Sequence, residues 1–264
     1  MANCLIIGYG WLGKPLAKVL QQKGMTIYAT TSQLNKATEM KADMISAELL
    51  EIEQGVLQWK VQPNIHFDTV IFTLPPFLEA LDSMVKLFNG LSFSQLIFTS
   101  STGVYVEKNA FLDEDATVNP SHKVSMMEEK IKEFAPDKYV ILRLAGHVGP
   151  NRHPLRYFLR QQTIISNGNT PVNLIHQSDM IRAIVACITQ HVQRKTYNIC
   201  WPEHPSKKDY YGKLAKEFAD EILEFEDGNI GKKIDGSKIT KDLLFEYEGS
   251  IQNINLLDLR KDNI

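Results

Sequence analysis

The first half of the chain alternates short apolar runs with stretches whose apolar residues recur at helical spacing. Five runs have the character of strands: Cys4–Ile7, Thr26–Thr30, Thr69–Thr73, Gln95–Thr99 and Tyr139–Leu144. Apolar residues at i, i+3 and i+4 predict three intervening helices: Leu12–Gln22, Leu78–Phe88 and one after Pro120. This alternation requires crossover connections, and it therefore predicts an α/β fold with a parallel sheet buried on both faces.

The pattern becomes less regular after Gly149. Val172–Ile175 and Thr196–Cys200 still have the composition of strands, and a helix is expected to open at Ser178 or Asp179 between them. A further helix is expected from Ser206, because Ser206 and Asp209 have the spacing of a capping box. The C-terminal part is therefore predicted to form a smaller α/β lobe.

Composition and charge narrow the class of protein. The 264 residues are 44% hydrophobic and 23% charged, which is the balance of a folded globular chain. A net charge of −2 gives no broad attraction for nucleic acid, and no apolar run approaches the roughly 20 residues of a membrane span. Because the three cysteines are few and widely spaced, we expect a reducing, cytoplasmic compartment and no disulfide framework.

A glycine-rich turn follows the first predicted strand. Gly8, Gly10 and Gly13 fit the pattern GxGxxG between a hydrophobic strand and a helix. In this pattern the first glycine permits a tight turn, the second lets backbone approach a diphosphate, and the third lets helix and strand pack closely. We expect six residues of the turn to contact a dinucleotide: Gly8, Tyr9, Gly10, Trp11, Leu12 and Gly13. The alternative is a strand-to-helix turn that binds nothing.

The end of the second predicted strand bears on the choice of cofactor. An acidic residue there would accept hydrogen bonds from an unphosphorylated ribose. Thr30, Thr31 and Ser32 stand in this region instead, with Lys36 nearby. Hydroxyl groups and a lysine tolerate a 2′-phosphate, so the sequence favours NADP over NAD, although no arginine supplies the usual clamp.

Several segments in addition to the turn resemble the extended short-chain dehydrogenase/reductases, and among them the atypical NAD-dependent epimerase/dehydratase-like proteins. The segments, in chain order, are 70–76 (VIFTLPP), 97–105 (IFTSSTGVY), 142–152 (LRLAGHVGPNR), 172–180 (VNLIHQSDM) and 197–200 (YNIC). The resemblance implies a Rossmann-type doubly wound domain over 1–148, to which 172–200 returns, and a substrate lobe mainly over 149–264. It also implies a small-molecule substrate and allows a homodimer.

The resemblance assigns roles to residues at two further strand ends. Leu74 and Pro75 after one strand, and Thr99 and Ser100 at another, would line the nicotinamide half of the cofactor. Ser101 stands four residues before Tyr105, where family members place the Ser or Thr that polarises the substrate oxygen. Ordinary packing at strand ends is the alternative for the cofactor-lining residues.

One family feature is missing. The resemblance calls for a YxxxK pair, in which the tyrosine transfers a proton and the lysine lowers its pKa. Alignment through the helix after Pro120 places Pro120 at the tyrosine position and Val124 at the lysine position, and no YxxxK occurs between Tyr105 and Tyr139. Since a positioned general acid typically contributes about 10² to 10⁴ in rate, this absence calls ordinary catalysis into question.

Two residues are candidates to replace the missing acid. His122 lies beside the vacant positions and carries an imidazole, the side chain most often used as a general acid or base, and Tyr105 carries a phenolic proton. The alternatives are that His122 lies on the solvent side of its helix and that the Tyr105 hydroxyl is satisfied by local packing. No HxxxH motif or carboxylate grouping indicates a metal site.

Two functions are consistent with these patterns. The first is an atypical NAD(P)-dependent oxidoreductase or epimerase that acts on a small polar, sugar-like metabolite, with Ser101, Tyr105 and His122 as its catalytic candidates. The second is a dinucleotide-binding sensor of redox state or metabolite level without catalysis. The first rests on the family resemblance and the second on the missing pair.

Overall fold

The computed structural model describes residues 1–53, 56–58, 65–75, 88, 90–161 and 164–252. The chain forms two compact units, and it passes from one to the other several times along the sequence. Unit 1 comprises residues 1–100, 119–142 and 187–196, and unit 2 comprises 101–118, 143–186 and 197–264. The boundary expected at 148–149 falls inside unit 2.

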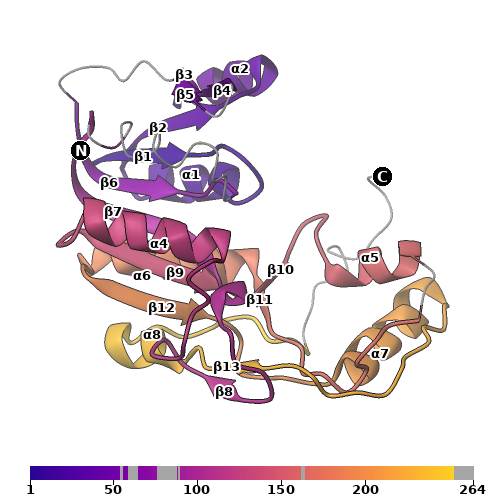
Figure 1. The fold of residues 1–264 in the computed structure, drawn as a ribbon. Coiled ribbons are helices and arrows are strands. Elements are labelled where there is room, and N and C mark those ends of the chain that lie inside the picture. Colours follow the sequence, from indigo (N-terminus) through magenta and orange to yellow (C-terminus); the bar gives the residue numbers. More distant parts are fainter. Residues whose placement is uncertain (54–55, 59–64, 76–87, 89, 162–163, 253–264) are drawn as a thin grey trace. The chain divides into compact units, whose positions relative to one another are not determined.

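The predicted α/β fold is confirmed. A seven-stranded sheet has the order β3-β2-β1-β6-β7-β9-β12 (Figure 1), and the pairs from β3 to β7 are parallel. The strands are β1 (Asn3–Ile7), β2 (Thr26–Thr31), β3 (Ser46–Leu49), β6 (His66–Phe72), β7 (Ser92–Ser101), β9 (Tyr139–Leu144) and β12 (Lys195–Ile199). The strand order reverses at β1, which lies between β2 and β6; ligands of open α/β sheets bind at such a point.

Three helices of unit 1 are described in full or in large part: α1 (Gly13–Gln22), α2 (Leu34–Ala42) and α4 (Lys123–Phe134). Helix α1 buries Leu16, Ala17 and Leu20, the stripe that the helical spacing predicted. The helix predicted over 78–88 lies outside the described residues except for Phe88, whose ring contacts Phe72 and Phe134. A short antiparallel pair, β4 (Glu51–Glu53) and β5 (Val56–Gln58), was not predicted.

Unit 2 contains two small parallel pairs and several helices. The pairs join β10 (Gly146–Val148) with β11 (Leu174–His176), and β8 (Phe111–Leu112) with β13 (Lys233–Ile234). The helices are η2 (Thr102–Val104), α5 (Pro154–Gln161), α6 (Gln177–Thr189), which ends in unit 1, α7 (Lys207–Ala219) and α8 (Ser237–Leu243). The predicted start of α7 is confirmed: Ser206 is its N-cap, and the Ser206 hydroxyl accepts a hydrogen bond from the Asp209 N–H and donates one to the Asp209 carboxylate.

No helix in the described part of the chain combines the length and the apolar character that crossing a bilayer requires.

A buried histidine joins α5 to α7 in unit 2. The Nδ1 atom of His153 accepts a hydrogen bond from the Leu155 N–H at 3.1 Å, and its Nε2 lies 3.1 Å from the Tyr210 hydroxyl. The side chain is 4% exposed, and burial, followed by the charge of Arg156, lowers its pKa to about 4. His153 is therefore neutral in the folded chain.

We predict that His153 makes stability fall on mild acidification. Its pKa is lower in the folded than in the unfolded chain, so the unfolded chain takes up the proton first and stability is lost as the pH falls below about 6.5. Between pH 7 and pH 5 this histidine should account for about 2 kcal/mol of the free energy of unfolding. Urea unfolding at both pH values tests this. His153→Phe should be less stable at pH 7 but flatter in its pH dependence; an unchanged dependence would contradict the assignment.

Candidate functional site

The turn between β1 and α1 has a backbone that only glycine accommodates at its first position. Gly8 has φ +112°, and a Cβ there would stand 2.8 Å from the Thr73 Oγ1 and 2.9 Å from the Leu74 Cδ2. Both the backbone conformation and the lack of space exclude a side chain. Gly8 thus places the end of β1 directly against the end of β6.

Gly13 allows α1 to begin close to the turn. A Cβ at this position would lie 2.0 Å from the carbonyl oxygen of Gly8, which is backbone and cannot move aside. A Cβ on Gly10, in contrast, would meet no atom within 4 Å. The turn therefore packs inward at Gly13 and is open at Gly10, as the GxGxxG pattern predicts for a backbone that another molecule approaches.

Two threonine hydroxyls fasten the turn to the neighbouring strands. The Thr30 hydroxyl accepts a hydrogen bond from the Gly8 N–H at 3.0 Å, and the Thr30 carbonyl accepts one from the Tyr9 N–H at 2.8 Å. The Thr73 hydroxyl faces the carbonyl oxygens of Ile7 and Gly8 at 3.2 and 2.9 Å. Thr30 is fully buried, and its side chain holds the turn in place.

The start of α1 is suited to an anion. Its N-cap residue, Leu12, provides no side-chain hydrogen bond, and no acidic residue occurs in the first turn. Leu12 is buried, whereas Trp11 is partly exposed. Backbone N–H groups and the helix dipole at such an end attract phosphate.

A pocket of about 150 Å³ lies beside the turn, at the carboxyl ends of β1 and β2. Its lining residues are Gly8, Tyr9, Gly10, Thr30, Thr31, Ser32, Gln33, Lys36, Leu50 and Leu74. Among the described side chains that line the pocket, Lys36 is the only charged one and none is a carboxylate. This part of unit 1 brings together seven of the residues that the sequence assigned to the cofactor.

The Tyr9 side chain packs against α2. It is 3% exposed, and its hydroxyl donates a long hydrogen bond of 3.4 Å to Asp43. Burial and, secondarily, the Asp43 carboxylate raise the pKa of Tyr9 to about 12. Tyr9 thus connects the glycine-rich turn to the helix that carries Lys36.

The residues expected around the nicotinamide differ in their surroundings. Leu74 lies against Gly8 and lines the pocket, whereas Pro75 is exposed. The Thr99 hydroxyl donates to the Phe72 carbonyl at 3.1 Å, and the buried Ser100 hydroxyl donates to Glu128 on α4. Both hydroxyls therefore have partners within unit 1, which favours the packing interpretation for their side chains.

The Ser101 hydroxyl keeps a proton that it can donate. Its oxygen accepts a hydrogen bond from the Gly103 N–H at 3.0 Å, which caps the short helix η2 in unit 2. A hydroxyl that accepts in this way can still direct its own hydrogen to another oxygen. The side chain is partly exposed, as a contact with substrate requires.

Tyr105 lies in a closed hydrogen-bond network of unit 2. Its hydroxyl donates to the Asn198 Oδ1 at 2.6 Å and accepts from Arg143 at 2.9 Å, while the Lys232 ammonium lies 5.6 Å from the ring centroid. Burial raises the pKa of Tyr105 to about 12 although Arg143 acts in the opposite direction. The phenol is engaged and weakly acidic, so these contacts favour the packing alternative over proton transfer.

His122 caps a helix. Its Nδ1 accepts a hydrogen bond from the Val124 N–H at 3.3 Å at the start of α4, which leaves the ring proton on Nε2. Val124, which the resemblance places at the lysine position, is buried, and Pro120, which it places at the tyrosine position, is exposed. This capping contact gives His122 a structural role that the amino-acid sequence did not reveal.

The described residues contain no group of three or more His, Cys, Asp or Glu side chains that could hold a metal ion. Two described pocket residues, Gln33 and Leu50, were not among those assigned to the cofactor from the sequence. Leu50 directly follows β3. Its position just after a strand of the sheet is the feature of the sequence that could have identified it.

We predict that Thr30→Val destabilises the protein by about 1–3 kcal/mol, because the buried Gly8 N–H loses its acceptor. Thr30→Ser keeps the hydroxyl and is the matched control. Denaturant unfolding of both variants measures the difference. Equal stability of the two would show that the hydroxyl does not hold the turn.

Solved structures resemble this chain over nearly its whole length. A functionally unknown conserved protein from Silicibacter pomeroyi has a TM-score of 0.76 at 17% identity, covering 97% of this chain and 96% of its own. A putative NAD-dependent epimerase/dehydratase from Methylobacillus flagellatus has a TM-score of 0.72 at 18% identity, covering 94% and 93%. The UDP-glucuronic acid 4-epimerase from Bacillus cereus, in complex with UDP-glucuronic acid and NAD, has a TM-score of 0.70 at 15% identity, covering 94% and 95%. At these identities the likeness establishes the fold.

No family model matches the sequence. A curated protein gives a match in sequence itself: Protein YeeZ of Escherichia coli (strain K12) is 31% identical over 266 residues, which cover 94% of this chain and 96% of that protein. Identity at this level over the full length shows common descent. The chain belongs to the family of Escherichia coli Protein YeeZ.

Proposed function

We propose that the chain binds a pyridine dinucleotide, with the diphosphate at the glycine-rich turn and the start of α1. The observation that carries this proposal is the shape of the glycine-rich turn. A Cβ at Gly13 would collide with the Gly8 carbonyl, whereas the space outside Gly10 is open. The uncapped α1 terminus supplies N–H groups and a positive dipole end. The residues present therefore fit the group that the fold family binds.

The chain's own residues have separate roles in this proposal. Thr30 and Thr73 hold the turn, the first turn of α1 binds the diphosphate, and Lys36 receives the ribose end. A bound nicotinamide supplies hydride transfer. Ser101 donates its hydroxyl hydrogen to a substrate oxygen and thereby polarises it.

The substrate we propose is a small polar, sugar-like metabolite, and the reaction an oxidation–reduction or epimerisation. The Bacillus cereus neighbour acts on a UDP-sugar with NAD, which supports this class. The three cysteines are free and buried, in line with a reducing, cytoplasmic compartment.

A sensor without catalysis is the second candidate, and a specific observation favours it. The Tyr105 hydroxyl is occupied by Asn198 and Arg143, and the His122 Nδ1 by a helix cap. The sequence has no YxxxK between Tyr105 and Tyr139. The contacts of Tyr105 and His122 do not position either side chain for proton transfer. Absorbance at 340 nm during incubation of NADH or NADPH with a panel of carbonyl metabolites separates the two: turnover supports the enzyme, and tight binding without turnover supports the sensor.

We predict that Gly10→Asp weakens dinucleotide binding at least about tenfold, because it places a carboxylate beside the proposed diphosphate site. The stability of the variant should change little, since nothing lies within 4 Å of the added Cβ. Gly10→Asn has the same size without the charge and is the control. Cofactor fluorescence titration measures both variants. Binding by Gly10→Asp that equals the parent protein would remove the basis of the proposal.

We further propose a preference for NADPH, because Lys36 is the one charged residue among the described side chains that line the pocket, and these include no carboxylate. Lys36→Gln should weaken NADPH binding about tenfold and change NADH binding little, as expected for loss of one charged contact to a 2′-phosphate. Lys41→Gln, at the other end of the same helix, is the control. Tighter binding of NADH than of NADPH by the parent protein would contradict the preference.

A further inference from the structure

Helix α2 carries Lys36, which lines the pocket beside the glycine-rich turn, and Glu39 three residues further along. Residues at this spacing are neighbours on the surface of a helix, and a lysine and a glutamate there can form an ion pair. A pair of this kind would neutralise the Lys36 ammonium. In the described part of the chain, however, no side chain forms an ion pair with Lys36.

Lysines of α1 instead hold the acidic side chains of α2 and of its C-cap. The Lys14 Nζ lies 2.8 Å from the Glu39 Oε2, and the Lys18 Nζ lies 3.4 Å from the Asp43 Oδ2. The hydrogen bond that Lys14 donates to Glu39 is the main cause of the raised pKa of Lys14. Glu39 is therefore held toward α1, although Lys36 is its neighbour on α2.

The start of α2 is suited to a negatively charged group. Gln33, its N-cap residue, also lines the pocket and provides no side-chain hydrogen bond to the helix, and no acidic residue occurs in the first turn. Backbone N–H groups and the dipole at such a helix end attract negative charge. Because Lys36 belongs to this first turn, its charge and the helix end lie beside the same part of the pocket.

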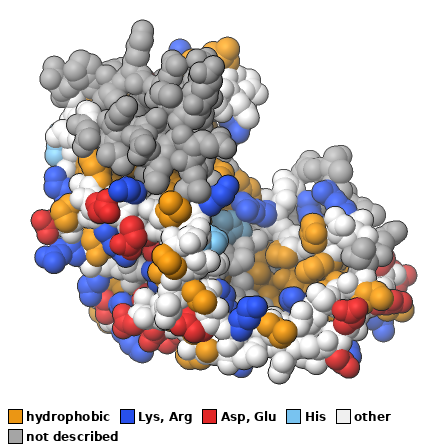
Figure 2. All heavy atoms as spheres, viewed as in Figure 1, with side chains coloured by type: hydrophobic (Ala, Val, Ile, Leu, Met, Phe, Trp, Pro, Cys, Tyr) orange, Lys and Arg blue, Asp and Glu red, His pale blue; other side chains and the backbone are white. Residues whose placement is uncertain are grey.

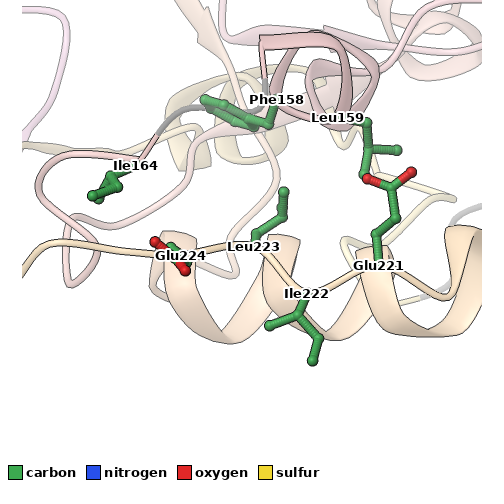
Figure 3. Close-up of a pocket in the computed structure, with 7 residues that line it drawn as sticks. All are labelled: Phe158, Leu159, Ile164, Glu221, Ile222, Leu223 and Glu224. Atoms are coloured by element: carbon green, nitrogen blue, oxygen red, sulfur yellow. The ribbon is translucent and has the colours of Figure 1, made fainter.

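Pairing of the acidic groups beside a pocket is not general in this protein. Glu221 and Glu224 line a groove of unit 2 (Figure 3), and neither forms an ion pair with a described side chain. On the face seen in Figure 2, acidic and basic side chains are interspersed, and the net charge is only −2. Local pairs, more than a broad field, therefore determine the potential beside Lys36.

From these contacts we infer that the Lys14–Glu39 ion pair determines cofactor selectivity: by holding Glu39 toward α1, Lys14 leaves the Lys36 ammonium available to the 2′-phosphate of NADPH. The inference rests on the proposed dinucleotide site. Without Lys14, Glu39 would pair with Lys36 or leave an unpaired negative charge near the phosphate, and either change weakens NADPH binding. NADH has no 2′-phosphate and is not affected in this way. Lys14 and Glu39 act through Lys36 and are thus positioning residues.

Fluorescence titrations of NADPH and NADH into the full chain test the inference, and the readout is the Kd for NADH divided by the Kd for NADPH. Lys14→Gln should lower this ratio about threefold, as expected for the loss of one exposed charge contact to the phosphate. Any loss of attraction between Lys14 and the diphosphate affects both cofactors and cancels in the ratio. Lys14→Arg keeps the pair with Glu39 and should keep the parental ratio.

The double variant Lys14→Gln/Glu39→Gln should recover the parental ratio, because no carboxylate remains at position 39 to occupy Lys36. A ratio that stays low in the double variant would overturn the inference, since the charge of Lys14 itself would then act on the phosphate. Lys18→Gln is the matched control. It also removes a lysine of α1, but it releases Asp43, seven residues from Lys36, and should leave the ratio unchanged.

The same titrations separate failure of the inference from failure of the proposed site. If the parent protein binds both dinucleotides and Lys14→Gln has the parental ratio, the ion pair does not determine selectivity and the proposed site stands. If the parent protein binds neither dinucleotide at saturating concentration, the proposed site and the inference both fall.

Discussion

Helix α1 can begin at the end of β1 only because residue 13 has no side chain. With a Cβ 2.0 Å from the Gly8 carbonyl, the first turn of the helix would have to move away from the sheet. The N–H groups of that turn would move with it. The geometry of the proposed dinucleotide site therefore depends on a close contact between two backbone segments.

Hydrogen bonds from neighbouring strands convert this contact into a fixed arrangement. The Thr30 hydroxyl accepts a hydrogen bond from the Gly8 N–H, and the Thr73 hydroxyl faces the Gly8 carbonyl. Residues at the ends of β2 and β6 therefore hold the turn from both sides. The sheet order places these strands next to β1, at the point where it reverses. The same topology that buries the core thus also positions the pocket.

Local patterns in the sequence were sufficient to predict the turn, the helix α1 and most strands of the large sheet, because each depends on residues close together in the chain. Helix α2 was missed because it buries only Met40 among its nine residues and so lacks an apolar stripe. The contacts of Tyr105 could not be predicted either. Its hydroxyl partners, Arg143 and Asn198, stand 38 and 93 residues away, and no local pattern reveals such a pairing.

The most direct test of the account is a crystal structure of the protein grown with NADPH. The account predicts diphosphate oxygens within hydrogen-bonding distance of backbone N–H groups between Gly10 and Gly13, at the uncapped start of α1. A dinucleotide bound elsewhere, or none bound at saturating concentration with NADPH or with NADH, would contradict it.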